Sequence, residues 1–459
     1  MKIFLGIAFW AILFLAIGCN RDDITFESPS QLLRFSTDTV FCDTVYSQMR
    51  SETYAVKVYN RENKDVKIPR IYLEGGNSSL YRINVDGKSG TDFQNVALRK
   101  NDSLYIFVEI APVANAPEAI AEDKVVFESP AGQQKVTLFS VVQDAEYFIQ
   151  TGANPVVINE NTTWTKDKVK VIFGNLEVAE GKTLTLEKGT KVYFRKNSGM
   201  SFKENSVLNI NGELGDEVIF RGDRSDTKYD TLPANWNGIK MEAGSTLNMN
   251  YARVFGGNVG LQLKKNTATI NNSMIHTFQN IGIYGIGATI TANNLVMNNC
   301  GEADIAMVDG GNYTFNFCTI ANYWNLTPGM TALAMYASDS YVDDDGNTET
   351  GNPTITVKNS IIYGDLPDMI VFDGNDINAD NFEYTLLKYS PTGAITFTGN
   401  NIIRNEDPKF QNYFTYKMNL RLKNDSPARN KGFYDPAIPT DIDNVSRGNP
   451  PTLGAYEIH

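Results

Sequence analysis

Between residues 238 and 323, apolar and polar residues alternate along short runs that recur every 22 residues. The runs begin at residues 238, 260, 282 and 304 and read Gly238-Ile-Lys-Met, Gly260-Leu-Gln-Leu, Gly282-Ile-Tyr-Gly and Asp304-Ile-Ala-Met. An alternation of period two is typical of a strand with one buried face. A fixed repeat of this length indicates stacked structural units. The pattern therefore predicts a β-solenoid.

Each repeat is rich in Ile, Val, Thr and Phe, with Asn and Gly between the apolar runs, which favours short strands separated by turns. Successive coils of such a solenoid stack in parallel about 4.8 Å apart, and parallel crossovers are right-handed by default. Asn accepts left-handed backbone angles, and stacked Asn amides bond from coil to coil. We expect a buried column of Ile239, Leu261, Ile283 and Ile305. We also expect an asparagine ladder, at the turn between second and third strands, of Asn250, Asn271, Asn293 and Asn316.

Residues 24–145 contain a different pattern, in which alternating runs are separated by turn clusters without a fixed period. Examples are the runs 54–59, 103–110 and 135–142 and the turn clusters 74–78 and 99–102. About seven such strands in roughly 120 residues suit an immunoglobulin-like β-sandwich, here without the usual buried cysteine pair. We expect this domain to act as a spacer or docking module, joined to the solenoid by a linker at residues 144–155.

The length of 459 residues agrees with two domains. The formal net charge of −12 repels nucleic acid, so no nucleic-acid partner is expected. It also disfavours polyanionic sugars unless a cation bridges them. Two histidines in the whole chain nearly exclude zinc clusters and Ser-His or Cys-His nucleophiles. Cys42, Cys300 and Cys318 do not share a register, so they predict buried thiols and no disulfide framework.

The first residues have the composition of an export signal, because Lys2 precedes an apolar run from Ile3 to Gly18 that ends at Cys19. The stretch Leu15-Ala-Ile-Gly-Cys resembles a bacterial lipobox, which implies a signal peptide at 1–18, lipidation of Cys19 and a tether at 19–23. An ordinary signal with an unrelated cysteine is the alternative. The tail Asn20-Arg-Asp-Asp resembles the export signal of Bacteroidetes-type surface lipoproteins. The resemblance implies a lipid anchor in the outer membrane and exposure at the cell surface.

Residues 155–459 resemble right-handed parallel β-helix proteins of the pectin-lyase-like fold. The entry coils 176–194, the run 208–214 and the segment 236–239 carry this resemblance, as does the closing region from Asp407 to Glu457. It implies an all-β chain, with an immunoglobulin-like sandwich followed by a right-handed parallel β-helix. It implies no activity, because one fold hosts lyases, hydrolases, binders and adhesins.

A candidate ligand face lies on the outer side of the first strands. We expect the outward column to be Lys240, Gln262, Tyr284, Ala306 and Ala334. Insertions at 223–235 and about 325–352 are expected to wall this face and to bring aromatic rings beside it, namely Trp236, Tyr229, Tyr323 and Trp324. Such rings stack on sugars. The alternative is that these aromatics seal the loops onto the coil.

Asp304 and Asp368 each begin a segment of the same pattern, in which Asp is followed by four apolar residues, Asp and Gly. We expect the two residues to begin strands two coils apart, with about 9–10 Å between their backbones. Carboxylates at roughly 6.5–9.5 Å suit inverting glycoside hydrolysis, but an Asp beside a strand is also ordinary turn chemistry. The acidic run Asp343–Asn347 raises the possibility of calcium. Its glycine does not fit an EF-type loop, which favours a solvated turn and no cofactor.

These observations leave two functions open. The first is a non-enzymatic surface lipoprotein that binds a polysaccharide or an envelope protein. The second is a polysaccharide-degrading enzyme, a glycoside hydrolase or lyase on the same scaffold. A lyase needs a basic residue and a cation to neutralise charge, and beyond Lys240 and Arg224 no Lys or Arg cluster is expected on the candidate face. The sequence therefore favours binding.

Overall fold

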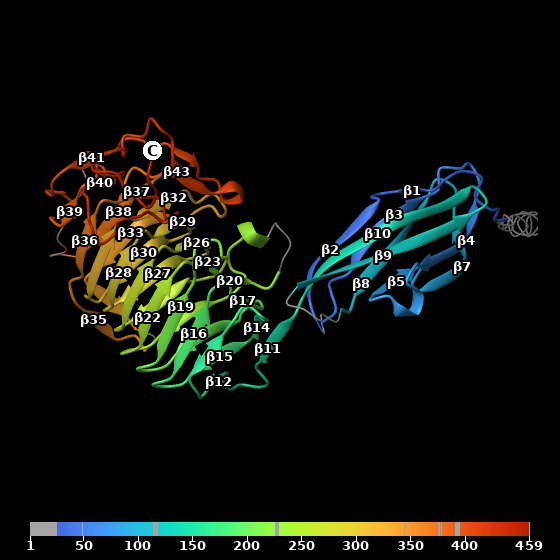
Figure 1. Cartoon of the computed structure of the whole chain (residues 1–459), viewed down its shortest axis with the longest axis horizontal. Coiled ribbons are helices and arrows are strands. Elements are labelled where there is room, and N and C mark those ends of the chain that lie inside the picture. The colour runs from blue at the N-terminus through green and yellow to red at the C-terminus, as the bar shows by residue number, and fades with distance from the viewer. Residues whose placement is uncertain are drawn as a thin grey trace, which may run out of the picture. The chain divides into compact units, whose positions relative to one another are not determined.

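The alternating runs form strands throughout the chain, and the computed structural model describes residues 25–458 except 48, 113–117, 225–228, 344, 375–376, 378 and 391–394. Cys19 and the predicted signal and tether lie outside the described residues. The chain divides into two compact units, Met1–Val142 and Gln143–His459 (Figure 1). Among the described residues, no helix is long and apolar enough to cross a membrane.

The first unit is a sandwich of two five-stranded sheets, with antiparallel pairing such as β3 with β8 and β4 with β9. One sheet has the order β1 (Arg34–Phe35), β3 (Tyr54–Tyr59), β8 (Ser103–Ile110), β5 (Tyr81–Val85), β6 (Lys88–Gly90). The other has the order β2 (Thr39–Tyr46), β10 (Gly132–Gln143), β9 (Glu118–Ser129), β4 (Val66–Leu73), β7 (Asp92–Leu98). A short 3-10 turn, η1, spans Gly76–Ser78. The inward residues of both sheets, such as Ile106 and Val125, are fully buried and form one core.

The second unit is a parallel β-helix, in which nine coils each contribute one strand to each of three long parallel sheets, and the third-strand sheet has one further strand at either end. The first-strand sheet contains β12 (Val156–Ile158), β15 (Asn175–Val178), β18 (Gly199–Phe202), β21 (Gly238–Met241), β24 (Leu261–Lys264), β27 (Ile281–Ile286), β30 (Ala303–Val308), β33 (Leu333–Ser338) and β38 (Ile370–Asp373). The second-strand sheet contains β13 (Thr162–Trp164), β16 (Thr183–Glu187), β19 (Val207–Asn211), β22 (Thr246–Asn250), β25 (Thr267–Asn271), β28 (Thr289–Asn293), β31 (Asn312–Asn316), β36 (Thr354–Lys358) and β39 (Phe382–Glu383).

The third-strand sheet contains β11 (Ala145–Ile149), β14 (Val169–Phe173), β17 (Lys191–Phe194), β20 (Val218–Gly222), β23 (Ala252–Phe255), β26 (Met274–Phe278), β29 (Val296–Cys300), β32 (Thr319–Asn322), β37 (Ile361–Gly364), β40 (Thr385–Leu387) and β41 (Ile402–Arg404). Because β11 pairs in parallel with β14, residues 145–149 belong to the first coil. The expectation of a linker reaching residue 155 is therefore wrong.

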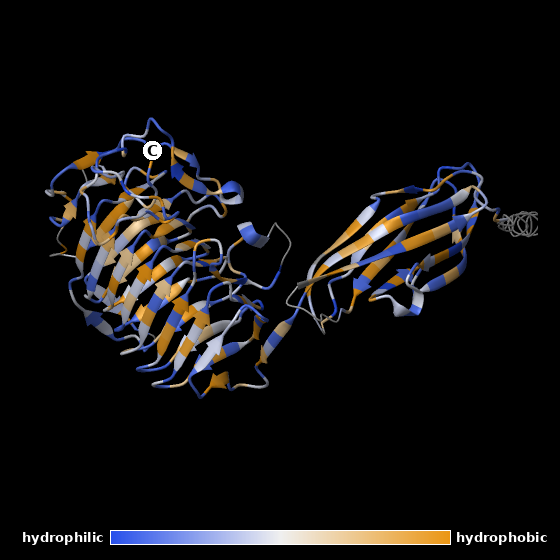
Figure 2. Ribbon diagram, in the orientation of Figure 1, coloured by the Kyte–Doolittle hydropathy of each residue, from blue (hydrophilic) through white to orange (hydrophobic). Residues whose placement is uncertain are grey.

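The predicted buried column is confirmed. Ile239, Leu261, Ile283 and Ile305 are direct partners in neighbouring strands, and each is at most 1% exposed. Hydrophobic and polar residues alternate along the strands of the β-helix, as the colours in Figure 2 show. The apolar set of each coil therefore meets the sets above and below it in one continuous core.

The asparagine ladder is also confirmed, since Asn250, Asn271, Asn293 and Asn316 pair in register. The amide of Asn293 donates to Asn271 Oδ1 at 2.9 Å. The left-handed backbone lies one residue later than expected, as at Asn272 with φ 47°. A second amide chain runs through these turn residues, with Asn272 donating to Asn250 and Asn294 donating to Asn272. Two parallel ladders therefore hold this corner of the coil.

The closing segment packs its apolar residues against the third-strand side of the β-helix. It contains the antiparallel pair β42 (Phe410–Asn412) and β43 (Asn419–Leu422), with the 3-10 turn η3 (Thr415–Lys417) between them. Arg447 is buried here, 3.7 Å from the Phe317 ring centroid and 3.6 Å from the buried carboxylate of Glu457. Burial lowers the pKa of Arg447 to about 10, so its guanidinium remains charged at neutral pH.

The predicted buried thiols are confirmed, because Cys42, Cys300 and Cys318 are buried and free. Two short elements outside the three parallel sheets matter for the candidate site. They are the 3-10 turn η2 (Tyr229–Thr231) and the hairpin of β34 (Ser340–Val342) and β35 (Thr348–Thr350).

Candidate functional site

The outward column of the first-strand sheet runs through Lys240, Gln262, Tyr284, Ala306 and Tyr336. The expectation of Ala334 at the last position is wrong, because Ala334 is fully buried and Tyr336 is the direct partner of Ala306. The run Met335-Tyr-Ala matches Ile283-Tyr-Gly residue for residue. That match is the signal that would have identified Tyr336 from the sequence.

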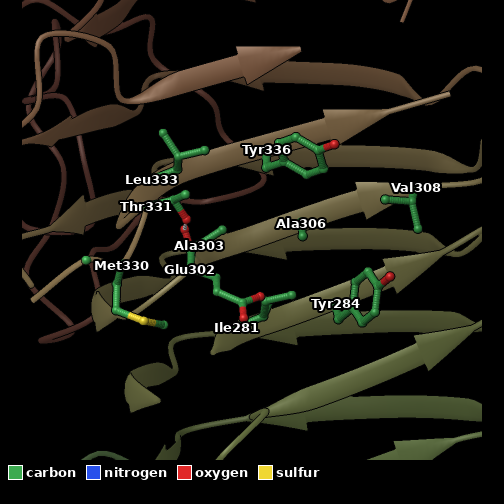
Figure 3. A pocket seen from close by; sticks show the side chains of 11 residues that line it. Ile281, Tyr284, Glu302, Ala303, Ala306, Val308, Met330, Thr331, Leu333 and Tyr336 are labelled. Carbon is green, nitrogen blue, oxygen red and sulfur yellow. Dashed lines mark hydrogen bonds between the residues drawn. The ribbon is translucent and has the colours of Figure 1, made fainter. Parts of the chain in front are cut away.

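A cavity of about 510 Å³ opens on this face between Tyr284 and Tyr336. Figure 3 shows the two tyrosine side chains on either side of Ala306, with Glu302 and Met330 toward the beginning of the strands. Ala306 has only a methyl group, which does not fill the gap, and two coil spacings separate the tyrosine backbones by about 9.6 Å. Carbon atoms in contact are about 3.5–4.0 Å apart. The gap therefore accepts one flat-sided ring between the two aromatics.

The second predicted insertion reaches this cavity, because Gly329, Met330 and Thr331 line it, and the hairpin β34–β35 contacts Tyr284 beside it. The Tyr341 ring meets the Tyr284 ring edge-on, with centroids 6.3 Å apart. Lys265 anchors the hairpin to the coil by pairing with Glu349, and its ammonium lies 3.5 Å from Asp309. Burial and the neighbouring Tyr341 raise the pKa of Tyr284 to about 12, so its phenol stays neutral at physiological pH.

The described residues of the first insertion, 223–224 and 229–235, do not line the cavity. The side chain of Asp230 pairs with Arg221 of β20 at 2.6 Å, and Asn235 donates to the Leu232 carbonyl at 2.8 Å. These contacts hold the loop against the third-strand sheet. Tyr229 lies in this loop with the guanidinium of Arg224 3.7 Å from its ring centroid. The expectation that Tyr229 flanks the candidate face is therefore wrong.

Trp236 and Tyr323 are also not exposed on the candidate face. Trp236 is fully buried, stacks on Phe194 at 4.2 Å and donates to the Phe255 carbonyl at 2.8 Å, so it packs inside the coil. Tyr323 is 7% exposed and stacks on Tyr413 at 4.1 Å. Trp324 is half-buried and donates to the Thr327 carbonyl of its own loop at 2.8 Å. Trp236 therefore belongs to the interior of the coil, and Tyr323 holds the closing segment against it, so neither ring seals an insertion loop onto the coil.

Lys240 and Gln262 line a second cavity of about 500 Å³, farther along the same outward column. This cavity is charged, unlike the one at Tyr284. Lys203 contributes to it and pairs with Glu242 at 2.8 Å and Glu177 at 3.4 Å. The exposed ammonium of Lys240 therefore shares this cavity with a second cation, Lys203, and with the carboxylates of Glu177 and Glu242.

Asp304 and Asp368 do not form a catalytic pair. Asp304 is fully buried, and no hydrogen bond of normal geometry satisfies either of its carboxylate oxygens within the described residues. Burial raises the pKa of Asp304 well above its ordinary value, so the group is held neutral. Asp368 accepts a hydrogen bond from the Ser390 backbone and lines a small separate cavity of about 120 Å³. A carboxyl without solvent access cannot act on a polysaccharide.

The burial of Asp304 follows from a break in the strand alternation. In a regular strand, residues two apart face the same side. Here Ala303 lines the Tyr284 cavity, whereas Ile305 points into the core, so the alternation is broken between them. Ala303 pairs with Ile281 and Ile305 with Ile283, and Asp304 takes no part in the ladder. Because the alternation slips by one residue here, Asp304 and Ile305 both face inward.

The acidic run forms the turn of the hairpin β34–β35. The side-chain amide of Asn347 donates to the carboxylate of Asp343 at 3.1 Å, and the backbone N–H groups of Asn347 and Asp345 donate to it at 2.7 Å and 3.0 Å. These hydrogen bonds lower the pKa of the Asp343 carboxyl. Gly346 supplies the left-handed angle, with φ 83°. Asp344 lies outside the described residues. Within the described part of the chain, no three or more acidic, His or Cys side chains gather in a way that would hold a metal.

No protein-family model matches this chain, and no curated protein matches it either. Among solved structures, the chain has a local similarity to the VesB protease of Vibrio cholerae. The identity is 9%, the TM-score is 0.17, and the match covers 24% of this chain and 31% of the protease. A similarity this weak carries no argument about fold or activity, so the function must be inferred from the site itself.

Proposed function

We propose that this protein is a non-enzymatic outer-membrane surface lipoprotein whose β-helix binds a neutral glycan in the cavity between Tyr284 and Tyr336. The lipobox-like sequence at Cys19 supports the anchor, and the sandwich unit, read as an immunoglobulin-like stalk, serves as its spacer. The single observation that carries the binding proposal is the pair of tyrosines on either side of Ala306.

The chemistry of the cavity suits a sugar. Aromatic faces stack against the C–H faces of a pyranose ring, a contact worth about 0.5–1.5 kcal/mol beyond area burial by analogy with aromatic pairs. The phenol groups and the exposed carboxylate of Glu302 can bond to sugar hydroxyls. Among the described residues, no Lys or Arg lines the cavity. A neutral glycan is therefore a better fit than an acidic one.

Binding is favoured over hydrolysis because the carboxylates at this cavity are badly placed for paired catalysis. Asp304 is buried, and Asp373, which accepts from the Tyr336 hydroxyl at 3.3 Å, lies at the far end of the strands from Glu302. Asp373 occupies the same position in its strand as Val308, because both are direct partners of Ser338 in the strand between them. Six residues of strand correspond to about 20 Å, well beyond the roughly 6.5–9.5 Å of inverting glycosidases.

A glycan array with the purified protein tests the proposal, followed by calorimetry on the strongest neutral glycan. Tyr284→Ala and Tyr336→Ala should each weaken binding about threefold to tenfold, since about 1.4 kcal/mol is one decade. Ala306→Phe should fill the gap and abolish binding. Tyr416→Ala, which removes a tyrosine that is 66% exposed elsewhere on the β-helix, is the matched control and should change nothing.

Three outcomes would overturn the proposal. If no neutral glycan binds, the envelope-protein partner becomes the better hypothesis. If a neutral glycan binds and Ala306→Phe retains full affinity, the site lies elsewhere. Turnover of the bound glycan would replace the binding function with the enzymatic one.

A further inference from the structure

The outer face of the sandwich unit exposes two large aromatic side chains on a strand that is not at the sheet edge. Tyr105 and Phe107 on β8 are 43% and 42% exposed, whereas Ile106 between them is fully buried. The two rings are parallel to within 9°, with centroids 5.8 Å apart. Strand β8 lies between β3 and β5, so its outward side is a sheet face. Exposed, adjacent aromatics at such a position mark an interaction surface.

The neighbouring strands leave this aromatic pair open. Phe107 has Ala55 as its partner on β3 and Asn84 as its partner on β5, and neither side chain is large enough to cover the ring. Tyr105 has Lys57 as its partner, with the ammonium 4.7 Å from the ring centroid. The surface therefore combines open ring faces with a cation and an amide, a combination that suits a polar ligand with apolar faces.

A cavity of about 600 Å³ lies at the end of β8, beyond the aromatic pair. Glu109, two residues beyond Phe107 on the same side of the strand, lines this cavity together with Arg50 and Arg82. The Nη1 atom of Arg82 donates to the carbonyls of Ser79 at 2.8 Å and Tyr81 at 2.7 Å, which holds its guanidinium in place. Two guanidinium groups against one carboxylate make the cavity cationic.

We propose that this face is a second, independent glycan-binding site, which takes a carboxylated terminal sugar. The sugar carboxylate would lie between Arg50 and Arg82, since guanidinium groups recognise carboxylates through paired hydrogen bonds. The next ring of the glycan would stack on Phe107, about 7 Å farther along the strand, which is two strand residues. The formal net charge of −12 opposes a polyanion at long range, so a single terminal carboxylate on an otherwise neutral glycan fits best.

The test is a glycan array probed with the full chain. Each glycan is present as a pair, with a terminal carboxylated sugar in one member and the methyl ester of that sugar in the other. The wild type should retain carboxylated members over their esters. Phe107→Ala and Arg50→Ala should each reduce that signal about tenfold, while neutral glycans bound through Tyr284 stay unchanged. Phe41→Ala is the matched control, because Phe41 is 69% exposed on the other sheet of the same unit.

The outcomes separate this proposal from the function assigned to the β-helix. Loss of the carboxylated signal in Tyr284→Ala but not in Phe107→Ala would overturn it. So would equal retention of acids and esters, or the absence of any carboxylated glycan among the ligands. Arg50→Lys should restore only part of the binding, because an ammonium cannot form the paired hydrogen bonds. Unchanged melting temperatures of all variants establish that the sandwich remains folded.

Discussion

Replacing Asp304 by alanine should stabilise the β-helix at neutral pH, which is unusual for a fully buried position. The neighbouring coil has Ala334 one residue before Met335, the direct partner of Ile305, so alanine matches the local backbone. Neither carboxylate oxygen of Asp304 has a hydrogen bond of normal geometry among the described residues, and the backbone N–H and thiol of Cys300 offset the effect of burial only in part. Burying an unsatisfied polar group costs about 1–3 kcal/mol. The substitution removes that cost and leaves a cavity of only a few atoms.

The effect should also depend on pH in a defined direction. Because burial raises the pKa of Asp304 in the folded state, the folded protein binds a proton that the unfolded chain releases above about pH 4. The native state is therefore destabilised as the pH rises toward the folded pKa, at about 1.4 kcal/mol per pH unit for this one group. The alanine variant lacks this loss, so its advantage over the wild type should widen by about 3 kcal/mol over two pH units in that window.

Urea unfolding of the wild type and Asp304→Ala at pH 4.5, 5.5, 6.5 and 7.5 measures the difference directly. Asp304→Asn is the second variant, because it keeps the shape and the unsatisfied polar atoms but removes the titration. Its own stability should lack the pH dependence that Asp304 causes, so its difference from the wild type should change with pH as for Asp304→Ala, but without the stabilisation gained by removing the polar atoms. A stability difference that stays constant between pH 4.5 and 7.5 would refute the reasoning. So would a loss of stability in Asp304→Ala at every pH.

Three further predictions concern the stability of the fold and the localisation of the protein. Leu261→Asp should cost several kcal/mol, because it places an unpaired carboxylate in the buried column, and an unchanged melting temperature would contradict the observed register. Arg447→Met should cost about 3–5 kcal/mol by leaving the buried Glu457 without its partner, whereas the double variant with Glu457→Leu should recover much of the loss in thermal unfolding. Cys19→Ser should release the protein from the membrane fraction, and retention after a carbonate wash would argue against the lipid anchor.

The parts of the fold that follow from a period could be predicted from the sequence. The buried column at Leu261 and the ladder at Asn271 depend on a repeat of 22 residues, and parallel stacking places equivalent residues directly above one another. The outward position of Tyr284 follows from the same alternation. Tyr336 was missed because the coil before it is longer than 22 residues, which shifts its position in the sequence without changing its place in the stack.

The side chains at the corners of the coil could not be predicted in this way. Trp236 lies just before β21, where the period-two rule does not apply, and the space inside the coil next to Phe194 decides its direction. The aromatic face of the sandwich, in contrast, could have been predicted. Ser103 and Glu109 alternate in phase with Tyr105 and Phe107 along β8, so the two polar residues mark this side of the strand as the exposed one.

The Tyr284 cavity and the buried Asp304 have a common structural origin. The change of side between Ala303 and Ile305 turns Asp304 inward, and the alternation that resumes after it points Ala306 outward. The same change occurs one coil earlier, where Ile281 lines the cavity and Ile283 is buried. There Gly282 occupies the irregular position, and a Cβ atom on it would meet Met297 at 2.6 Å. The irregularity therefore brings Ile281 and Ala303 to the cavity side together with Tyr284, and the cavity depends on two consecutive coils sharing the same local backbone.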